Sequence, residues 1–353
     1  YTYLLIGIIA LTYAVWRYAD TDSLYKRLAL TLASVAGLYL LSKYLYLPYR
    51  LWYGQAYSAL DPWNGPFTPL ASYFTHWGLF LFIIVSWLAW ETREWMANTP
   101  LSALKKLKPY QLLIEGALIA LVILVLWTQY RGTSVGWVAL PLAAWAGVLL
   151  LNPRLSDSKR LVSFLVGTAL FITVLVDVVV VRGDIGRANT IFKFYLQAWL
   201  MLAVSSGAML AWLFNDLLRW LPGWRGFWQT SLTLLVAGAA MFTITGTMGK
   251  IQDRWIVEAP RTLDAMGYMA YANYDDFGRR LDLSEDYRAI RWMQEHIQGS
   301  PVIVEANCPE YRWCTRFTMY TGLPGVVGWN FHQRQQRVYT SVQVEERVAS
   351  VGN

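Results

Sequence analysis

The chain has 353 residues, of which 56% are apolar and only 15% are charged. Its mean hydropathy is +0.32 and its formal net charge is +7. Soluble globular domains carry about 25% charged residues, so this composition excludes an ordinary soluble protein and indicates a membrane protein. The basic residues are spread over short connections between apolar runs, which favours membrane topology over nucleic-acid binding as their explanation.

A helix needs about 20 mostly apolar residues to cross a bilayer, and eight stretches of the chain fit that requirement. The predicted spans are Thr2–Tyr18, Arg27–Leu47, Phe74–Trp95, Tyr110–Tyr130, Thr133–Leu151, Leu161–Val181, Ile191–Phe214 and Phe227–Gly249. A very short turn at Arg131 and Gly132 joins the fourth span to the fifth, which predicts an antiparallel pair. We therefore expect a mainly α-helical, polytopic transmembrane bundle over residues 1–250.

Basic residues orient this bundle, because the cytoplasmic connections of membrane proteins carry an excess of Lys and Arg. One set of alternate connections holds twelve basic residues: Arg17, Lys26, Arg27, Arg93, Lys105, Lys106, Lys108, Arg154, Lys159, Arg160, Arg219 and Arg225. The other set holds six: Lys43, Arg50, Arg131, Arg182, Arg187 and Lys193. We expect the first set to be cytoplasmic in a multi-pass plasma-membrane protein. The loops Pro48–Thr75 and Arg182–Thr190, and all residues after Lys250, then face outward.

The tail from about Ile251 differs in composition, because charged and polar residues return. Ser284 as an N-cap with acidic residues after it predicts a helix that runs to about Gln298. The segment Pro301–Ala306 reads as a buried strand. We expect a small extracytoplasmic α/β domain over residues 251–353, which packs on the bundle or continues past Asn353.

The two cysteines of the chain, Cys308 and Cys314, both fall in this tail. An external compartment permits a disulfide, and no other cysteine competes for either partner. A disulfide is therefore favoured over two free thiols. Two Cys and three scattered His lack zinc-ligand spacing, so no metal-ligand set is predicted.

The stretch Arg182–Trp199 places many polar and charged side chains at the start of an apolar helix. Ionisable residues there are costly unless paired, and they mark a functional site by default. Asn189, Lys193 and Gln197 follow one another at i,i+4 steps and share a helix face, which suits a phosphate or pyrophosphate head group. The predicted substrate-binding residues here are Arg187, Asn189, Lys193, Tyr195 and Gln197.

Asp184 in the same stretch could act as a base or hold a divalent cation such as Mg²⁺ or Mn²⁺. The alternative is internal neutralisation, in which Asp177 or Asp184 pairs with Arg187 or Lys193 and only joins two helices. The spacing supports both interpretations equally.

Asp61, in the loop Pro48–Thr75, is the second candidate carboxylate. A residue before proline is usually part of a turn, although a carboxylate that faces lipid head groups can be catalytic. Trp63 nearby can stack on a sugar ring, but interfacial placement is favoured. In the tail, His332 and Arg334 fit either a cap that grips an anionic lipid-linked substrate or a solvated basic surface, and the surface is slightly favoured.

The motif Asp184–Trp199 resembles the signature of the "YYY" archaeal and Chloroflexi-type multi-spanning membrane proteins. The segments Val302–Ala306, Gly328–His332, Asn64–Pro66 and Leu79–Phe82 fit the same family. This family is grouped with the GT-C class of integral-membrane glycosyltransferases. The resemblance implies a polyprenyl-phosphate sugar donor, an external active site, and an acidic residue in an early external loop as base or metal ligand.

We therefore expect a GT-C-type glycosyltransferase that takes a sugar from a polyprenyl-phosphate donor at the outer membrane face. Asp184 and Asp61 are its candidate catalytic residues, and its partners are membrane lipids and the lipid-linked sugar, without nucleic acid. The alternative is a non-enzymatic membrane scaffold or subunit with membrane-protein partners. A transporter ranks last, because the polar residues gather at the outer edge and not at the midplane.

Overall fold

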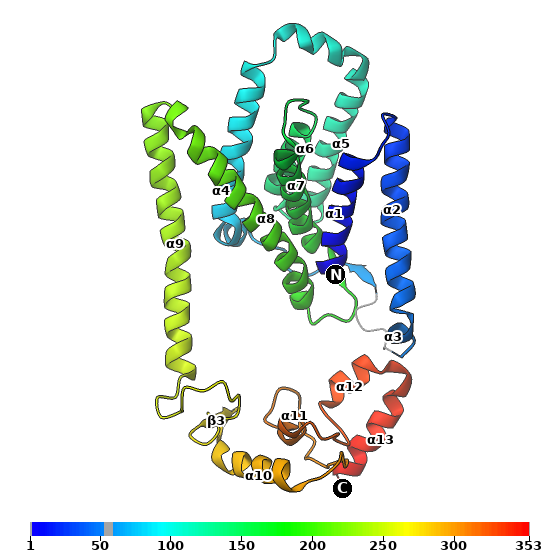
Figure 1. The fold of residues 1–353 in the computed structure, drawn as a ribbon, viewed down its shortest axis with the longest axis vertical. Coiled ribbons are helices and arrows are strands. Elements are labelled where there is room, and N and C mark those ends of the chain that lie inside the picture. Colours follow the sequence, from blue (N-terminus) through cyan, green and yellow to red (C-terminus); the bar gives the residue numbers. More distant parts are fainter. Residues whose placement is uncertain (1, 53–58, 353) are drawn as a thin grey trace. The chain divides into compact units, whose positions relative to one another are not determined.

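The computed structural model describes residues 2–52 and 59–352, and it divides into two compact units (Figure 1). Unit 1 comprises residues 1–39 and 57–243, and unit 2 comprises residues 40–56 and 244–353. Residues 53–58 of the predicted external loop Pro48–Thr75 lie outside the described residues.

Helices make up most of unit 1. They are α1 (Thr2–Tyr18), α4 (Leu70–Ala97), η1 (Leu101–Tyr110), α5 (Gln111–Tyr130), α6 (Gly136–Leu149), α7 (Asp157–Val178), α8 (Ala188–Asp216) and η2 (Leu217–Arg219). Two long helices, α2 (Leu24–Leu45) and α9 (Pro222–Arg254), begin in unit 1 and end in unit 2. Two short strands, β1 (Leu60–Pro62) and β2 (Val179–Val181), complete unit 1.

Each of the eight predicted spans coincides with a helix, although the last residues of the sixth, Val179–Val181, form the strand β2. Among the described residues, six helices are long and apolar enough to cross a membrane, namely α2, α4, α5, α7, α8 and α9. The helices α1 and α6 are shorter, and the 14 residues of α6 reach about 21 Å, less than the ~30 Å hydrocarbon core. The protein is therefore a mainly α-helical polytopic membrane protein, as predicted.

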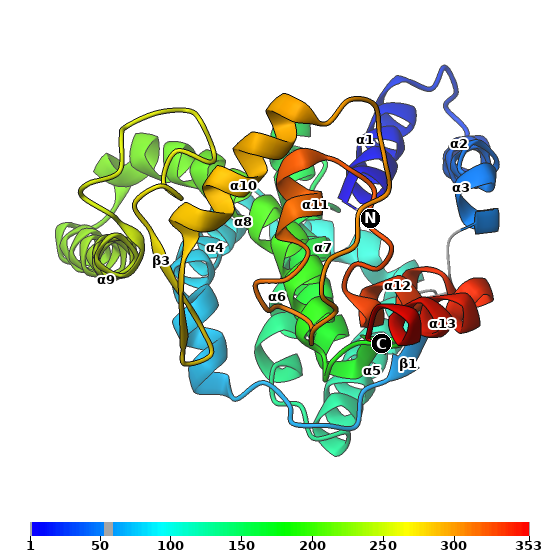
Figure 2. The same ribbon diagram turned by 90° about the horizontal axis from the view of Figure 1, so that it is seen from below.

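The core of unit 1 is built around α7, which packs against both α6 and α8 (Figure 2). Small side chains permit this approach: Ala169 of α7 and Ala198 of α8 are fully buried, and a Cβ on Gly167 would lie 3.7 Å from the Ala143 carbonyl oxygen. Helices in lipid associate through such close packing, since lipid is as apolar as the side chains. By contrast, α2, α5 and α9 are mostly exposed, as helices that face lipid must be.

Charged contacts gather the helix ends of unit 1 into two groups. At one end, Lys159 pairs with Glu91, Arg219 pairs with Glu94, and Arg17 donates to Asp157. This end holds the connections predicted to be cytoplasmic, and we name it the basic end. The other end holds β1 and β2, and we name it the sheet end.

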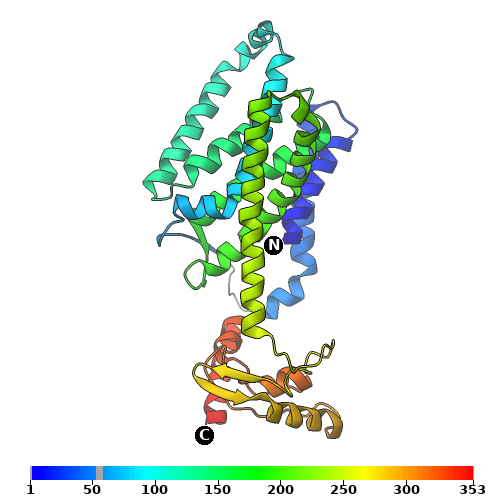
Figure 3. The same ribbon diagram turned by 90° about the vertical axis from the view of Figure 1, so that its left-hand side faces the viewer.

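Unit 2 contains a hairpin of β3 (Asn273–Asp276) and β4 (Arg279–Asp282), followed by α10 (Leu283–His296) (Figure 3). Its remaining helices are α3 (Leu47–Trp52), α11 (Arg316–Thr321), α12 (Asn330–Gln336), η3 (Val338–Thr340) and α13 (Ser341–Gly352). Met269 and Ile290 are fully buried in a small apolar core.

Two local predictions for unit 2 are wrong. The N-cap of α10 is Asp282 and not Ser284, because the Asp282 carboxylate accepts from the backbone N–H of Ser284. The segment Pro301–Ala306 is not a buried strand: only Ile303 forms a bridge, with Gly325, and the side chains of Val302 and Val304 are exposed. A short apolar segment with a single bridge partner cannot form a strand, because the described residues include no neighbouring strand with which it could pair.

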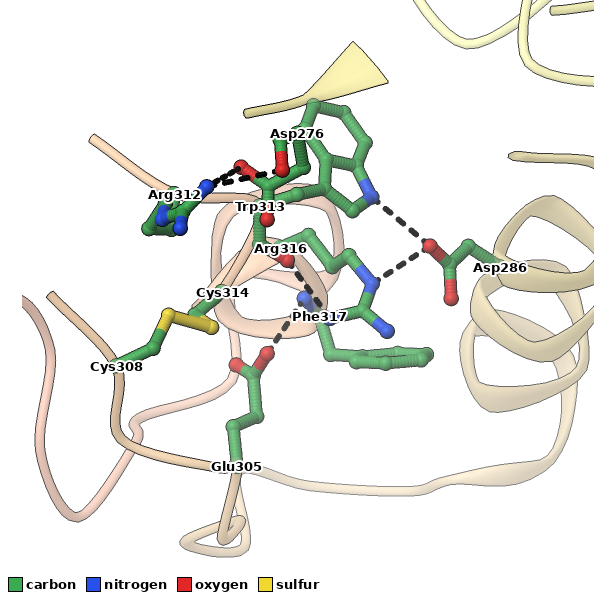
Figure 4. Close-up of a disulfide and its surroundings, with 9 residues drawn as sticks. All are labelled: Asp276, Asp286, Glu305, Cys308, Arg312, Trp313, Cys314, Arg316 and Phe317. Atoms are coloured by element: carbon green, nitrogen blue, oxygen red, sulfur yellow. Dashed lines mark hydrogen bonds and ion pairs between the residues drawn. A yellow bond between two sulfur atoms is a disulfide. The ribbon is translucent and has the colours of Figure 1, made fainter. Parts of the chain in front are cut away.

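Cys308 and Cys314 form a disulfide in unit 2 (Figure 4). The segment between them is anchored to the rest of the unit, because Arg312 donates to the Asp276 carbonyl (2.9 Å) and the indole of Trp313 donates to Asp286 (2.9 Å). Each of these two partners lies in the preceding hairpin or helix, so two residues just before Cys314 attach the disulfide loop to the rest of the unit.

Glu305, just before this loop, is tied to α11. Its carboxylate accepts from the backbone N–H group of Phe317 (3.1 Å; Figure 4). It also accepts from the backbone N–H group of Thr318 (2.8 Å), in the same first turn of that helix. A carboxylate at this position satisfies donors that have no partner inside the helix. Glu305 therefore has a structural role within unit 2.

Candidate functional site

The sheet end of unit 1 is assembled by an antiparallel pairing of β1 with β2, in which Asp61 is opposite Val180. Further backbone hydrogen bonds extend the pairing on both sides, from Trp63 to the Val178 carbonyl (2.8 Å) and from Arg182 to the Ala59 carbonyl (2.8 Å). The loop before α4 is thereby joined to the connection between α7 and α8. Two segments more than 100 residues apart form one surface.

The pairing brings Asp61 to Arg182. The Arg182 guanidinium donates at two points, from Nη2 to Oδ1 (2.8 Å) and from Nε to Oδ2 (3.1 Å). Both side chains are exposed, Arg182 by 66% and Asp61 by 39%. The hydrogen bond from Arg182 lowers the pKa of Asp61 below its ordinary value, so this carboxylate is ionised and accessible at neutral pH.

Asp177, at the end of α7, is the buried centre of the sheet end. Its side chain is fully buried and forms an ion pair with Arg187, which follows the α7–α8 connection. Its carboxylate also accepts from the hydroxyls of Thr68 (2.6 Å) and Thr133. A buried carboxylate requires this many partners, because an unpaired charge away from water is strongly unfavourable.

Arg187 is held beside Asp177 by further contacts. Its guanidinium also donates to the Val176 carbonyl (3.0 Å) and the Thr68 hydroxyl (3.0 Å), and it lies 5.4 Å from the centroid of the Trp63 ring. Only 10% of its side chain is exposed. This is the internal neutralisation that the sequence left open for Arg187, so a substrate phosphate would have to displace Asp177 to reach it.

Asp184 caps the start of α8. Its carboxylate accepts from the backbone N–H groups of Asn189 (3.1 Å) and Thr190 (2.8 Å), and from their side chains. Burial raises the pKa of Asp184, but the hydrogen bonds from Thr190 and Asn189 outweigh it and hold the pKa below its ordinary value. Asp184 is a poor proton acceptor in this state, and Asn189 is committed to it.

The other residues predicted on α8 lie along the same helix. Lys193 is half-buried, and Gln197 is buried and donates to the Lys193 carbonyl (3.4 Å). The Tyr195 ring packs edge-on against Trp77 of α4, with centroids 5.1 Å apart, and lies 5.8 Å from the ring of His76. An aromatic wall therefore lines α4 and α8 next to the buried ion pair.

Arg131, at the end of α5, reaches the same end of the unit. Its guanidinium donates to the Trp63 carbonyl (2.9 Å) and to Oδ1 of Asn64 (3.0 Å). The turn after it requires glycine: Gly132 has φ of +98°, and a Cβ there would lie 2.7 Å from the ring of Phe67. This tight turn holds the α5–α6 connection against the loop before α4.

His332 and Arg334 belong to α12 of unit 2. His332 makes a hydrogen bond with the Tyr311 hydroxyl (3.1 Å) and packs near Trp329 (5.7 Å between ring centroids). Arg334 donates to Oδ1 of Asn330 (3.1 Å). Their predicted contact with substrate stays a prediction.

Sequence reasoning did not select Thr68 and Thr133, which complete the hydrogen bonds of Asp177, or Arg182 as the partner of Asp61. Threonines are common in membrane helices and loops, so the residue type alone does not indicate that these two belong to a site. Asp177 did have a signal, since a carboxylate near the end of a predicted span requires a partner. Among the described residues, no group of three or more His, Cys, Asp and Glu side chains is placed to hold a metal ion.

The fold and this end of the bundle define a polytopic membrane protein whose inter-span loops are joined into one polar surface. The chain belongs to the family described as "Uncharacterized membrane protein (DUF2298)", whose model matches residues 1–202. The match includes every residue of the sheet end and stops before unit 2's tail. Neither the curated proteins nor the solved structures contain a match to the chain.

Proposed function

We propose that the protein is a GT-C-type membrane glycosyltransferase that takes a sugar from a polyprenyl-phosphate donor at the outer face of the plasma membrane. The observation that supports this best is the exposed, two-point pair of Asp61 and Arg182 at the sheet end. It offers one accessible carboxylate and one accessible guanidinium on a surface between membrane helices. These are the groups that such a transfer requires.

In the proposed reaction, Arg182 turns from Asp61 to the donor phosphate. A guanidinium binds phosphate oxygens at two points, as it binds the carboxylate. Loss of Arg182 raises the pKa of Asp61, because that hydrogen bond is what lowers it. Asp61 then accepts the proton of the acceptor hydroxyl. The acceptor oxygen bonds to the anomeric carbon, the bond from that carbon to the phosphate oxygen breaks, and polyprenyl phosphate departs.

A divalent cation, Mg²⁺ or Mn²⁺, fits this site only together with the donor. Mg²⁺ is commonly held by one or two carboxylates plus substrate phosphates and water. Asp61 is an exposed carboxylate of the sheet end, and in this alternative it would supply the protein ligand instead of acting as the base. The cation would neutralise charge on the departing phosphate.

The outward orientation of the sheet end rests on the distribution of basic residues. The basic end has twelve Lys and Arg in its connections and the opposite end has six. A cysteine placed at Ser102 and, in a second variant, at Asn64 tests it, with Cys308 and Cys314 held in their disulfide. We expect a membrane-impermeant maleimide to label the Asn64→Cys variant in whole cells and to label Ser102→Cys only after lysis.

The activity is tested with the full protein in liposomes and radiolabelled polyprenyl-phosphate hexoses, by following label that leaves the lipid phase. We expect Asp61→Asn to lower the rate by about 10²-fold or more and Arg182→Gln to raise the KM for donor. The matched control is Asp157→Asn, which breaks an exposed Asp–Arg pair at the basic end. Retention of the full rate by Asp61→Asn, alongside an active wild type, would refute the assignment.

One observation favours the second candidate, a non-enzymatic membrane scaffold. Arg187 is neutralised inside the protein by Asp177, and Asp184 is committed to capping α8. These contacts join α7 to α8 and need no ligand. If the wild type binds no polyprenyl phosphate and releases no sugar from any donor of the panel, the scaffold replaces the enzyme.

A further inference from the structure

Unit 1 has a cavity at its basic end, opposite to the sheet end along α4. It has a volume of about 590 Å³ and lies where the last turns of α4 meet η2 and the start of α9. Hydrogen bonds hold these elements together around it, since the indole of Trp228 donates to Ser86 (2.9 Å) and that of Trp90 donates to Asp216 (2.8 Å). The cavity is thus built by elements that are fixed to one another.

Aromatic rings form the wall of this cavity. Trp90 and Trp220 have centroids 5.4 Å apart, Trp220 and Trp228 lie 5.7 Å apart, and Phe82 stacks on Trp228 at 6.0 Å. Val85 and Ala89 of α4 also face it. An apolar wall on a membrane protein suits an acyl chain, and tryptophan is favoured where hydrocarbon meets head groups.

Two arginines line the same cavity, Arg93 from α4 and Arg219 from η2. Both guanidinium groups lie over the Trp90 ring, 4.7 Å and 5.2 Å from its centroid. This cation–π contact holds two positive charges near each other at one edge of an apolar surface. Such an arrangement has the two parts of an anionic lipid site, a hydrocarbon wall and a cationic rim.

The exposed edge of this rim is cationic, although the two arginines are paired with two acidic side chains, Glu94 and Asp216. Arg93 and Arg219 are 60% and 53% exposed, whereas Glu94 and Asp216, which accept from them, are 26% and 28% exposed. The guanidinium groups therefore lie outermost. Each guanidinium has five N–H donors, and in the described part of the chain the acidic neighbours occupy one donor of Arg93 and two of Arg219.

We propose that this cavity binds an anionic phospholipid of the membrane, with its phosphate between Arg93 and Arg219 and one acyl chain against the tryptophan wall. The site is distinct from the sheet end and does not depend on the proposed transferase activity. Charge complementarity selects the anionic lipid, because a zwitterionic head group brings its own cation to the arginine rim.

The experiment uses the full protein in detergent micelles, titrated with phosphatidylglycerol or phosphatidylcholine and measured by native mass spectrometry. We expect wild type to bind phosphatidylglycerol more tightly. The double variant Arg93→Gln/Arg219→Gln should bind it roughly tenfold or more weakly, since each basic residue near a head group contributes ~1 kcal/mol. The matched control, Lys105→Gln/Arg225→Gln, removes the same charge from the same end outside the cavity and should bind as wild type does.

A second measurement uses wild-type protein only, so its result does not depend on whether the variant folds. Wild-type protein is irradiated with a photoreactive phosphatidylglycerol, and the adducts are mapped by peptide mass spectrometry. Adducts within residues 82–93 and 219–228 support the site. Adducts confined to other segments, equal binding of the two lipids by wild type, or equal loss of phosphatidylglycerol binding in both double variants would overturn it.

Discussion

The carboxylate of Asp177 and the guanidinium of Arg187 form a buried ion pair that joins the end of α7 to the start of α8. Asp177 has no exposed surface, and Thr68 and Thr133 from two other connections also donate to it. Four segments of unit 1 therefore meet at one carboxylate. Much of the stability of the sheet end depends on this single group.

Loss of either charge should be costly. We expect Asp177→Asn or Arg187→Gln to lower the free energy of unfolding by ~3–5 kcal/mol, because each leaves its partner buried and uncompensated. Thermal denaturation of the purified protein in detergent measures this. The double variant should recover part of the loss, and Arg17→Gln, which breaks an exposed pair at the basic end, should barely change the melting temperature. A melting temperature in Asp177→Asn equal to that of wild type would contradict the buried pair.

Asp184 should stabilise the start of α8. Its carboxylate satisfies the backbone N–H groups of Asn189 and Thr190, so Asp184→Ala should cost ~1–2 kcal/mol of stability. Asp184→Asn retains one acceptor oxygen and should lose less. Hydrogen exchange of the first turn of α8 measures the local effect, and unchanged protection at Asn189 and Thr190 in Asp184→Ala would argue against the cap.

The same group should contribute to acid sensitivity. The pKa of Asp184 in the folded protein lies below its ordinary value of 3.8, so the unfolded chain binds its proton first as the pH falls. Its contribution to stability is therefore complete well above pH 3.8 and is lost as the pH falls through the folded-state value. Melting temperatures from about pH 6 to about pH 3 should decline less steeply in Asp184→Asn than in wild type. If the melting temperatures of the two proteins declined in parallel, Asp184 would have the same pKa in the folded and unfolded states, contrary to this prediction.

Gly132 should tolerate no side chain. A Cβ at this position would collide with the Phe67 ring, and the backbone φ of +98° is strained for any residue with a side chain. Gly132→Ala should therefore lower the free energy of unfolding by at least ~1 kcal/mol. Gly116, inside α5, is the matched control, because a Cβ there meets nothing within 4 Å. Gly116→Ala should leave the melting temperature unchanged or slightly raised. Similar effects of the two substitutions would mean that the turn is not constrained by Phe67.

The disulfide should stabilise unit 2. Cross-linking residues six positions apart removes chain entropy worth ~2 kcal/mol from the unfolded state. We expect Cys308→Ser/Cys314→Ser, or wild type treated with a reductant, to be cleaved faster by a protease between residues 305 and 330. Alkylation of wild type without reductant is the check: two modified cysteines per chain would show that the bond does not form.

Most helices of unit 1 could be predicted because each is a long apolar run, and length alone separates such runs from strands. The helix α6 fell short because Thr133 and Ser134 form the turn before it, so fewer residues of its apolar run are helical than the run suggests. The prediction of a buried strand at Pro301–Ala306 was wrong for a different reason. Apolar residues show that a segment can pair, but the existence of a partner strand is a tertiary property.

The sequence could predict which residues belong to the candidate site, but not which acidic residue pairs with which basic residue. Asp61, Asp184 and Arg187 attract notice because ionisable groups are rare beside membrane helices. Which acid meets which base depends on the register of β1 and β2, and two three-residue strands carry too little pattern to predict it. Asp61 therefore pairs with Arg182, whereas Arg187 turns inward to Asp177.

The pairing of β1 with β2 also sets an order of events during synthesis. Asp61 leaves the ribosome 121 residues before Arg182, and at ~5–20 residues per second this separation is on the order of ten seconds. During that interval the loop before α4 has no strand to join, and Thr68 has no Asp177 to bind. The sheet end thus closes only once the connection from α7 to α8 has been made, which is late in the synthesis of the bundle.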